Sequence, residues 1–415
     1  MEGSVSVLLV IGSGDQRYRE YLLESMASRQ RLWLFDAKTP TWQARHLVGW
    51  TVVDVFDVDA LVAAARHLAD ATPVVGVVCY DEALILPAAH VREALGLPGM
   101  RVETVRRCRD KSRTRATLSR AGVAQPRSVA VASLDEARAE AAAIGYPVVL
   151  KPRGLGASLG VVKVGNHAEL ERAFEAARSA TYPGVPTYKR GVLVEDFLDG
   201  PEISVDGCVV DGAYEPLFVA RKQLGLAPYF EETGHVVSAD DELVTDTDLR
   251  ALLGAAHRAL GIHTGITHSE VRLTSRGPRI VEVNGRLGGD LIPYLGWLAT
   301  GIDPGHVAVD VALGRRPTSR PTCRRSIGIR FFYPPDDCRV LSIHVPSPDP
   351  TSGIHQSTAL VGPGTELRLP PNGYVSRYAY VICQAADASA CAESLEAAAA
   401  RVELTWEHLP AACRA

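Results

Sequence analysis

Two apolar segments, ITHSEVRL and RIVEVN, each carry a glutamate and are joined by TSRGP, whose Gly and Pro are turn residues. The pattern predicts a β-hairpin. If Leu273 pairs with Arg279, Glu270 falls opposite Glu282, with the two Cβ atoms roughly 4.5 to 5.5 Å apart. Like charges that face each other destabilise a sheet, so we expect a cation between the two carboxylates.

A divalent metal ion is the simplest cation for this position. Asn284 lies on the same face as Glu282 because side chains alternate along a strand, and its amide oxygen is a third hard ligand. Carboxylate and amide oxygens without His or Cys favour Mg²⁺ or Mn²⁺. Mg²⁺ that is held by so few protein groups usually completes its shell with phosphate and water, so the expected ligand is a nucleotide. The alternative is a solvated strand face without function.

A glycine-rich segment, VVLKPRGLGASLGVV, supports phosphate binding independently. Gly154, Gly156 and Gly160 let the backbone approach a ligand, and Ser158 with nearby amides can donate to phosphate oxygens. Lys151 enters from the preceding strand. The Walker pattern GxxxxGK[ST] is absent, because this lysine precedes the glycines. Glycines also serve ordinary turns, so the loop alone is weak evidence.

A third segment, VLVEDFLDGPEISVDG, has the residues of an adenosine pocket. It reads as a strand that ends in an acid and a bulky apolar pair, followed by a second acid. Backbone groups there could hold an adenine edge, and Glu202 could bind ribose hydroxyls. Mostly apolar walls with few polar anchors suit such a pocket. By itself the segment would also pass as a strand and its turn.

Two further side chains are candidates for contact with a substrate. His268 precedes Glu270 by two positions and therefore shares its face, which could bring the imidazole to a substrate carboxylate or acyl phosphate as a catalytic residue. Glu82, at the tip of the predicted strand VVGVVCYDE, could bind an α-ammonium group. For His268 an ordinary packed or surface histidine is the alternative.

The elements that must position these residues fall into three predicted domains. Residues 1–105 alternate between strands and helices, which predicts a Rossmann-like α/β domain with a parallel sheet. Residues 106–314 change to an α+β pattern. Within them we expect a lid subdomain at about 140–200, with the glycine loop between two antiparallel strands, and a metal and catalytic subdomain at about 201–314. A C-terminal α+β domain follows at 315–415.

Composition restricts the class of protein. Apolar residues make up 47% and charged residues 22% of the chain, as in a soluble globular protein. The formal charge of -4 predicts no bulk attraction to nucleic acid or to an acidic membrane. The eight cysteines lack zinc or redox spacing, and no signal peptide or membrane span is evident. We expect a cytoplasmic protein that acts on small molecules, without a nucleic acid or membrane partner; a homodimer is left open.

Four motifs occur in the order and at about the spacing of the ATP-grasp enzymes. They are the lysine of RDKSRTRATLSRAGVAQP, the glycine loop, VLVEDFLDGPEIS, and SEVRL with VEVNGRLGG. The chain resembles this superfamily from Lys111 to about Gly289. YFEETGHVVSA and GITHSEVRL, with GVVCYDEALILPAAHVREALGLPG upstream, look most like the L-amino acid ligases and the carnosine-synthase-like enzymes.

The resemblance implies an ATP-grasp fold, ATP and Mg²⁺ (or Mn²⁺) as cofactors, and a mobile phosphate loop at residues 153–160 that includes Gly156 and Ser158. It also implies a role for each of the matching residues. Those roles are the ATP phosphates and adenine region for Lys111 and Lys151, the adenine pocket for Glu195, Phe197 and Leu198, ribose for Glu202, metal for Glu270, Glu282 and Asn284, the phosphoryl-transfer and acyl-phosphate states for Arg286, and the substrate site for His235, Arg286, Gly288 and Gly289.

The implied reaction is the ATP-dependent joining of a carboxylate, expected to be that of an amino acid, to an amine. An acyl phosphate forms first, and the amine then displaces phosphate to give an amide or dipeptide with ADP and phosphate. Secondary metabolism is the expected setting. Two alternatives stay open: a ligase of purine or cofactor metabolism on the same scaffold, and an inactive nucleotide-binding regulatory module. The sequence does not identify the two substrates.

Overall fold

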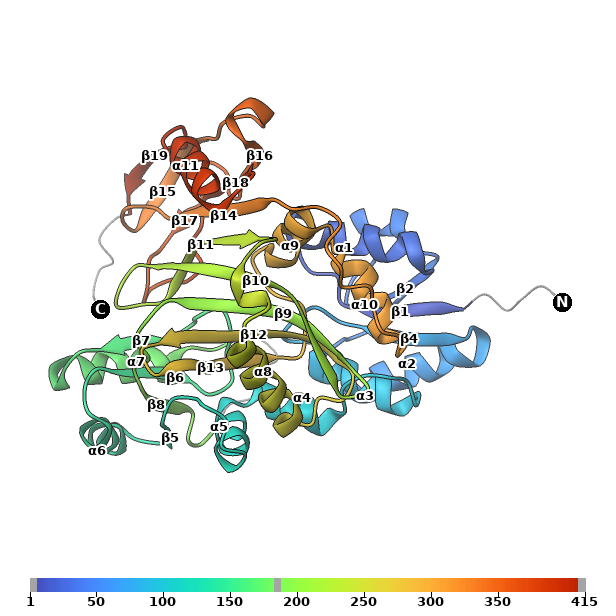
Figure 1. The fold of residues 1–415 in the computed structure, drawn as a ribbon, viewed down its shortest axis with the longest axis horizontal. Helices are drawn as coiled ribbons and strands as arrows, with labels where there is room; N and C mark the ends of the chain where they lie inside the picture. Colours follow the sequence, from blue (N-terminus) through green and yellow to red (C-terminus); the bar gives the residue numbers. More distant parts are fainter. Residues whose placement is uncertain (1–5, 183–187, 410–415) are drawn as a thin grey trace.

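The computed structural model describes residues 6–182 and 188–409. Its N-terminal part is the expected parallel sheet, with the strand order β3-β2-β1-β4 (Figure 1). All five residues of β1 are buried, as expected for a parallel strand that is covered on both faces. The strands are β1 (Val7–Ile11), β2 (Leu32–Asp36), β3 (Gly49–Val52) and β4 (Val74–Val78), and the helices are α1 (Gln16–Arg29), η1 (Trp42–His46), α2 (Val58–Ala71) and α3 (Ile85–Ala94).

A small antiparallel sheet has the strand order β5-β8-β6-β7 and lies in the region expected to act as a lid, so it is called the proposed lid. The glycine loop joins β6 to β7, which pair in the predicted antiparallel sense. Its apex is tightly turned, since Ala157 and Ser158 both have φ near +54°. The elements here are α4 (Val102–Arg109), α5 (Lys111–Arg120), β5 (Ser128–Val131), α6 (Leu134–Ile144), β6 (Val148–Pro152), β7 (Val162–Val164), η2 (His167–Glu169), α7 (Leu170–Ser179) and β8 (Val192–Asp196).

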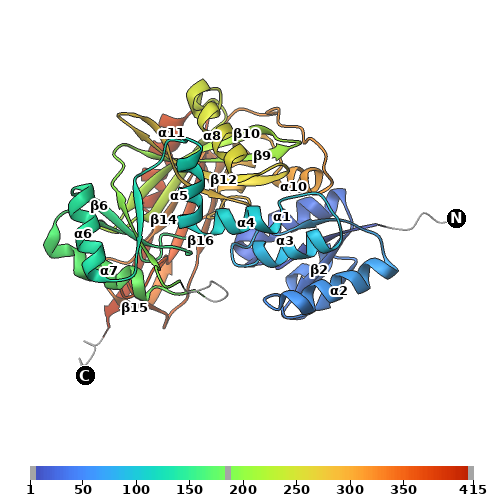
Figure 2. The same cartoon turned by 90° about the horizontal axis from the view of Figure 1, so that it is seen from below.

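An eight-stranded antiparallel sheet forms the centre of the molecule, with the order β13-β12-β9-β10-β11-β14-β18-β16. The N-terminal unit and the proposed lid lie on different sides of it (Figure 2). Its strands are β9 (Glu202–Val210), β10 (Ala213–Gly225), β11 (Glu231–Ser238), β12 (Gly265–Thr274), β13 (Gly277–Asn284), β14 (Ser326–Phe332), β16 (Ile354–Ala359) and β18 (Ala379–Ala385). The other elements are η3 (Glu242–Val244), α8 (Thr247–Leu260), α9 (Ile292–Thr300), α10 (Pro304–Ala312), η4 (Pro350–Ser352) and α11 (Ala388–Ala399).

The C-terminal residues share this central sheet. Strands β14, β16 and β18 extend it beyond residue 315, and a three-stranded sheet of β15 (Cys338–His344), β17 (Glu366–Leu367) and β19 (Glu403–His408) lies beside it. The limits 1–105, 106–314 and 315–415 therefore stay a proposed division of the chain. Within residues 6–182 and 188–409, no helix has the length and apolar character needed to cross a membrane.

The hairpin of β12 and β13 has the predicted carboxylate pair, but its register differs near the turn. Glu270 lies opposite Glu282 as predicted, whereas Leu273 pairs with Pro278, so the expected Leu273–Arg279 pair is wrong by one residue. A β-bulge directly after Glu270 absorbs the difference. A bulge leaves one residue of a strand outside the ladder, and sequence periodicity does not reveal where it lies.

Alternation along the two strands separates the core from the site. Val271 and Val283 are buried in the hydrophobic cluster that packs against α8, while Glu270 and Glu282 line a pocket on the opposite face. Fully burying a valine or leucine side chain contributes roughly 1.5 to 3 kcal/mol. The core thus fixes which face of the hairpin carries the carboxylates.

Candidate active site

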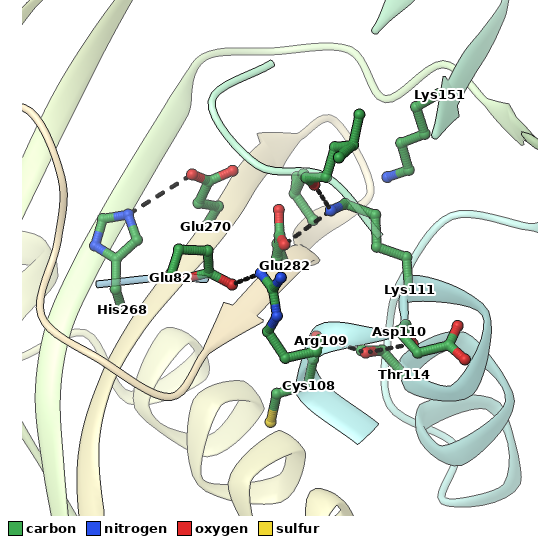
Figure 3. Close-up of polar contacts among 12 residues, drawn as sticks. Glu82, Cys108, Arg109, Asp110, Lys111, Thr114, Lys151, His268, Glu270 and Glu282 are labelled. Carbon is green, nitrogen blue, oxygen red and sulfur yellow. Dashed lines mark hydrogen bonds and ion pairs between the residues drawn. The ribbon is translucent and has the colours of Figure 1, made fainter. Parts of the chain in front are cut away.

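Most of the predicted residues line one pocket between the proposed lid and the central sheet. Side chains reach it from α5, from β6 and its glycine loop, from β8, and from β9, β12 and β13. Figure 3 shows Lys111, Lys151, Glu270 and Glu282 among them. The pocket is lined by Lys111, Lys151, Gly156, Ser158, Glu195, Phe197, Leu198, Glu202, Glu270 and Glu282. Arg286 and Glu82 line an adjacent cavity, and His268 lies beside Glu270.

A buried ion triad lies in the wall of this pocket, beside the residues predicted to contact adenine. Both Arg115 and Lys151 contact Glu195, with Arg115 Nε 2.7 Å and Lys151 Nζ 2.6 Å from its oxygens. Burial alone would raise the pKa of Glu195, but the two cations outweigh it and lower the pKa to about 2. Burial lowers the pKa of Lys151, and Glu195 offsets only part of that effect. The carboxylate thus holds two cations in place beside the pocket.

The first residue of α5 reaches the carboxylate pair. Asp110 caps α5 by accepting from the backbone N–H of Ser112, and it also accepts two bonds of 2.6 Å from Arg153 in the glycine loop. The helix start and the loop are therefore tied together. Lys111 Nζ then lies 3.0 Å from Glu282 Oε1 and donates to the carbonyl of Leu155.

A second buried lysine, on β10, holds three carboxylates. Lys222 Nζ lies 2.7 Å from Glu202, 2.6 Å from Glu232 and 3.2 Å from Glu270. Burial would lower the pKa of Lys222, but the three acids raise it well above its usual value. Glu202 also accepts from Arg272 Nε at 2.9 Å, and these two residues face each other across β9 and β12. Glu202, the predicted ribose ligand, is thus fixed by two cations.

His268 lies next to Glu270 on the face that carries the predicted metal ligands, as its spacing predicts. Its Nδ1 is 2.5 Å from Asp206 Oδ1, and its Nε2 is 3.6 Å from Glu270 Oε1. Burial alone would lower the pKa of His268, but Asp206 outweighs it and the pKa rises to about 9. The backbone N–H of Gly288 donates to the other Asp206 oxygen at 3.0 Å, which links the glycine turn after β13 to this pair.

The two glycines of that turn should respond differently to substitution. A Cβ at residue 288 would lie 2.9 Å from His268 Nδ1 and 3.0 Å from Asp206 Oδ1, whereas a Cβ at residue 289 meets nothing within 4 Å. We expect Gly288→Ala to lower the free energy of unfolding by about 1 to 3 kcal/mol through overpacking. Gly289→Ala, the matched control, should stay within about 0.5 kcal/mol of the unmodified protein. Denaturant unfolding measures both, and equal values would contradict the close contact.

His235 connects the acids around Lys222 to the C-terminal residues through Glu232 and Asp290. Its buried Nε2 is 3.2 Å from Glu232 Oε2 and 3.7 Å from Asp290 Oδ2. Burial would lower the pKa of His235, but its two acidic neighbours raise it. Arg377 makes two bonds to Asp290, of 2.7 and 2.8 Å. His235 thus belongs to a chain of contacts from Arg377 to Glu232, which also lines the main pocket.

Glu82 lies between two guanidinium groups. Its carboxylate accepts from Arg109, at the end of α4, and from Arg286, just after β13 (Figure 3 shows the Arg109 contact). Burial alone would raise the pKa of Glu82, but Arg286 and Arg109 lower it. An ideal Cβ on Gly156 would lie 3.8 Å from Glu82 Cγ, so the glycine loop approaches this group closely.

The donor atoms of the carboxylate pair suit a hard divalent cation. Glu270 and Glu282 supply carboxylates, and Asn284 is buried at the end of the same strand. Each carboxylate lies beside one ammonium group, from Lys222 and from Lys111. Oxygen donors without a thiolate favour Mg²⁺ or Mn²⁺. Glu270 also belongs to a tight group of acids with Glu202 and Glu232.

Sequence reasoning missed the cations and acids that hold the predicted residues. A usable signal existed for Arg115, because Lys111, Arg115 and Leu118 follow helical spacing on the buried face of α5. The others depend on strand register or on contacts between distant segments. The missed residues are Arg109, Arg115, Asp206, Lys222, Glu232, Arg272, Asp290 and Arg377.

Three family models match the chain. The model of the ATP-grasp domain matches residues 144–294, and that of the ATP-grasp N-terminal domain matches residues 33–99. The model of the L-amino acid ligase C-terminal domain 2 matches residues 330–407. The matches follow one another along the chain and together include the glycine loop, the hairpin of β12 and β13 and most of the C-terminal strands.

The chain is also similar to individual amino-acid ligases and related synthases. The chain is 31% identical to alanine–anticapsin ligase of Bacillus subtilis over 254 residues, which cover 56% of this chain and 52% of that protein. It is 28% identical to carnosine synthase 1 of Gallus gallus over 265 residues, 60% of this chain and 28% of that protein. The chain therefore spans about half the length of the first of these relatives. The crystal structure of an L-amino acid ligase from Bacillus licheniformis superposes with a TM-score of 0.78 at 21% identity, covering 98% of this chain and all of the other, which shows the same fold.

Proposed function

The chain belongs to the ATP-grasp superfamily, in its L-amino acid ligase-like group, and we propose from this that it is an ATP-dependent carboxylate–amine ligase. The first substrate is the carboxylate of an amino acid, and the second is the amine of another amino acid or a related molecule. The products are an amide or dipeptide, ADP and phosphate. We also propose that the enzyme acts in secondary metabolism and that it works in the cytoplasm, where ATP is present.

One observation carries the proposal: two carboxylates, Glu270 and Glu282, face each other in the pocket beneath the glycine loop, with Lys111 and Lys222 beside them. The two carboxylates can bind a divalent cation, and the two lysines can bind phosphate oxygens, so this group suits a metal–nucleotide complex. Glu270, Glu282 and Asn284 would hold Mg²⁺ or Mn²⁺, which when bound supplies positive charge to the phosphate oxygens.

The remaining roles follow from the residues that surround that centre. Phosphoryl transfer needs positioning and positive charge more than covalent chemistry from the protein. Lys111 and Lys151 supply charge along the phosphates, and the backbone amides from Gly156 to Ser158 cover them. The proposed contacts are adenine for Glu195, Phe197 and Leu198, ribose for Glu202, phosphoryl and acyl phosphate for Arg286, and substrate for Glu82, His235, His268, Gly288 and Gly289.

The proposed reaction has two steps. A carboxylate oxygen of the first substrate attacks the γ-phosphorus, the bond from that phosphorus to the β–γ bridging oxygen breaks, and ADP leaves. The unprotonated amine of the second substrate then attacks the acyl carbon, and the bond from that carbon to the phosphate oxygen breaks. The new amide nitrogen loses one proton to the solvent. Closure of the glycine loop over the pocket would keep water from the acyl phosphate.

Of the two alternatives, a ligase of purine or cofactor metabolism uses the same pocket residues. The match of residues 330–407 to an L-amino acid ligase domain favours amino-acid substrates over that reading. An inactive regulatory module would not need Lys151, Glu270, Glu282 and Arg286 together in and beside one pocket.

A screen of amino-acid pairs tests the proposed function. With ATP and Mg²⁺, at least one pair of L-amino acids should release phosphate and give a product with the mass of the pair less one water. Each amino acid alone is the control, since it should give little phosphate. Nucleotide binding with no phosphate release from any pair would support the regulatory module, and turnover restricted to purine precursors would support the other ligase.

A further inference from the structure

A second cavity, of about 150 Å³, lies beside the nucleotide pocket. It shares Leu155, Gly156 and Ala157 of the glycine loop with that pocket, and its other wall includes Arg109 and Arg286. A cavity of this size can hold a molecule as large as benzene. It therefore has room for a small carboxylate beside the reacting end of a nucleotide.

The two arginines of this cavity have donors to spare. Their side chains are only 12% and 13% exposed. Among the described residues, Arg109 donates one hydrogen bond, to Glu82, and Arg286 donates to Glu82 and to the carbonyl of Leu287. Each guanidinium carries five N–H donors in a planar fork. Because most of these donors have no acceptor among the described residues, the cavity favours a ligand that supplies acceptor oxygens.

The hydrogen bonds at the cavity favour an anion over an ammonium group, because both acids in its wall already accept bonds. Both oxygens of Glu82 already accept a bond from a guanidinium. Asp81 also lines the cavity, but its Oδ1 accepts from the backbone N–H of Ala83 at 2.9 Å. Two arginines face one shared glutamate, and paired guanidinium forks match the geometry of carboxylate oxygens.

We propose that Arg109 and Arg286 together bind the carboxylate that is to be phosphorylated, and that Glu82 acts through them as their counter-ion. Arg109 thereby becomes a substrate-binding residue, contributed by α4 rather than by the metal-binding strands. The inference rests on the proposed function for the identity of the anion. It replaces the direct substrate contact proposed above for Glu82, the α-ammonium ligand expected from the sequence, with the role of a counter-ion.

Replacement of Arg109 tests the site directly. In the most active amino-acid pair of the screen, Arg109→Gln should raise KM for the carboxylate substrate by about ten- to a hundredfold, the effect of losing charged hydrogen bonds. KM for ATP should stay within about twofold, and Arg109→Lys should recover only part of the loss because it lacks the fork. The matched control is Arg106→Gln, an exposed residue of the same helix. An unchanged KM for the carboxylate, or a parallel rise in KM for ATP, would overturn the assignment.

A binding measurement separates this inference from the proposed function. Inorganic phosphate is titrated by calorimetry into protein saturated with Mg²⁺ and ADP, and Arg109→Gln should weaken its affinity at least about tenfold while Arg106→Gln leaves it unchanged. If no amino-acid pair turns over but phosphate affinity depends on Arg109, the proposed function fails and the anion site stands. No phosphate binding, or equal affinity in Arg109→Gln, overturns the site.

Glu82→Gln separates the two roles of Glu82. As a counter-ion to both guanidiniums, Glu82 affects any carboxylate in the cavity. The variant should therefore change the affinities of L-alanine and propionate, titrated in the presence of Mg²⁺ and ADP, by the same factor. A loss confined to L-alanine would overturn the counter-ion role and assign Glu82 to the α-ammonium group.

Discussion

Glu282→Ala should reduce amino-acid-dependent ADP release by about 10³-fold or more, while the protein stays folded. Removing one carboxylate of the opposed Glu270–Glu282 pair removes a proposed metal ligand and leaves Lys111 without its ion-pair partner. Losses of several kcal/mol in transition-state charge stabilisation are typical when such a centre is disabled. Initial rates of ADP release, with the most active pair of the screen, give the measurement.

The fold should tolerate this change. The Glu282 side chain keeps 15% of its surface exposed, and Lys111 retains the carbonyl of Leu155 as an acceptor. Glu215→Ala is the matched control. Glu215 lies on the same central sheet, its side chain is 47% exposed, and it forms an ion pair of 3.6 Å with Arg250. The control should keep normal turnover. Both variants should keep the circular dichroism spectrum of the unmodified protein. Normal turnover in Glu282→Ala would contradict the metal assignment.

The sequence predicted those parts of the fold and site that depend on local patterns. The parallel N-terminal sheet follows from alternating strands and helices, and the facing of Glu270 and Glu282 follows from the short turn between two strands. The error at Leu273 has a local cause, since a bulge changes the register by one residue. Local patterns also carry the lysines and glycines of the family motifs, because each motif lies within one helix, one strand or one hairpin and the loop beside it.

The partners of these residues depend on contacts that a single sequence does not reveal. Asp206 lies opposite His268, and Glu202 lies opposite Arg272, because β9 and β12 pair in one register. The two pairs have the same spacing on both strands, so a known register would predict both pairs together. The strands are separated by more than 50 residues in the chain, however, and the sequence alone does not show that they pair. Arg377 reaches Asp290 from still farther along the chain. The charge that a site residue meets is therefore less predictable than the residue itself.

Glu195→Gln should lower the free energy of unfolding by about 3 to 5 kcal/mol in the absence of nucleotide, because it leaves two buried cations without their counter-ion. The side chains of Arg115, Lys151 and Glu195 are at most 6% exposed, so water screens them little. Denaturant unfolding provides the measurement. Glu136→Gln is the matched control in the same sheet region, since the Glu136–Arg190 pair is exposed and worth at most about 1 kcal/mol.

The difference in free energy of unfolding between the unmodified protein and Glu195→Gln should also depend on pH, which provides an independent check on its cause. The pKa of Glu195 is lowered from 4.5 to about 2 in the folded protein, so its charge stabilises the fold fully above about pH 4.5. Below that pH the unfolded chain takes up a proton first, and the stabilisation declines until the folded carboxylate is itself protonated near pH 2. The difference in free energy of unfolding between the unmodified protein and Glu195→Gln should therefore become smaller as the pH falls from 4.5 towards 2. A difference that stays constant over this range would mean that Glu195 stabilises the proposed lid by packing rather than by charge.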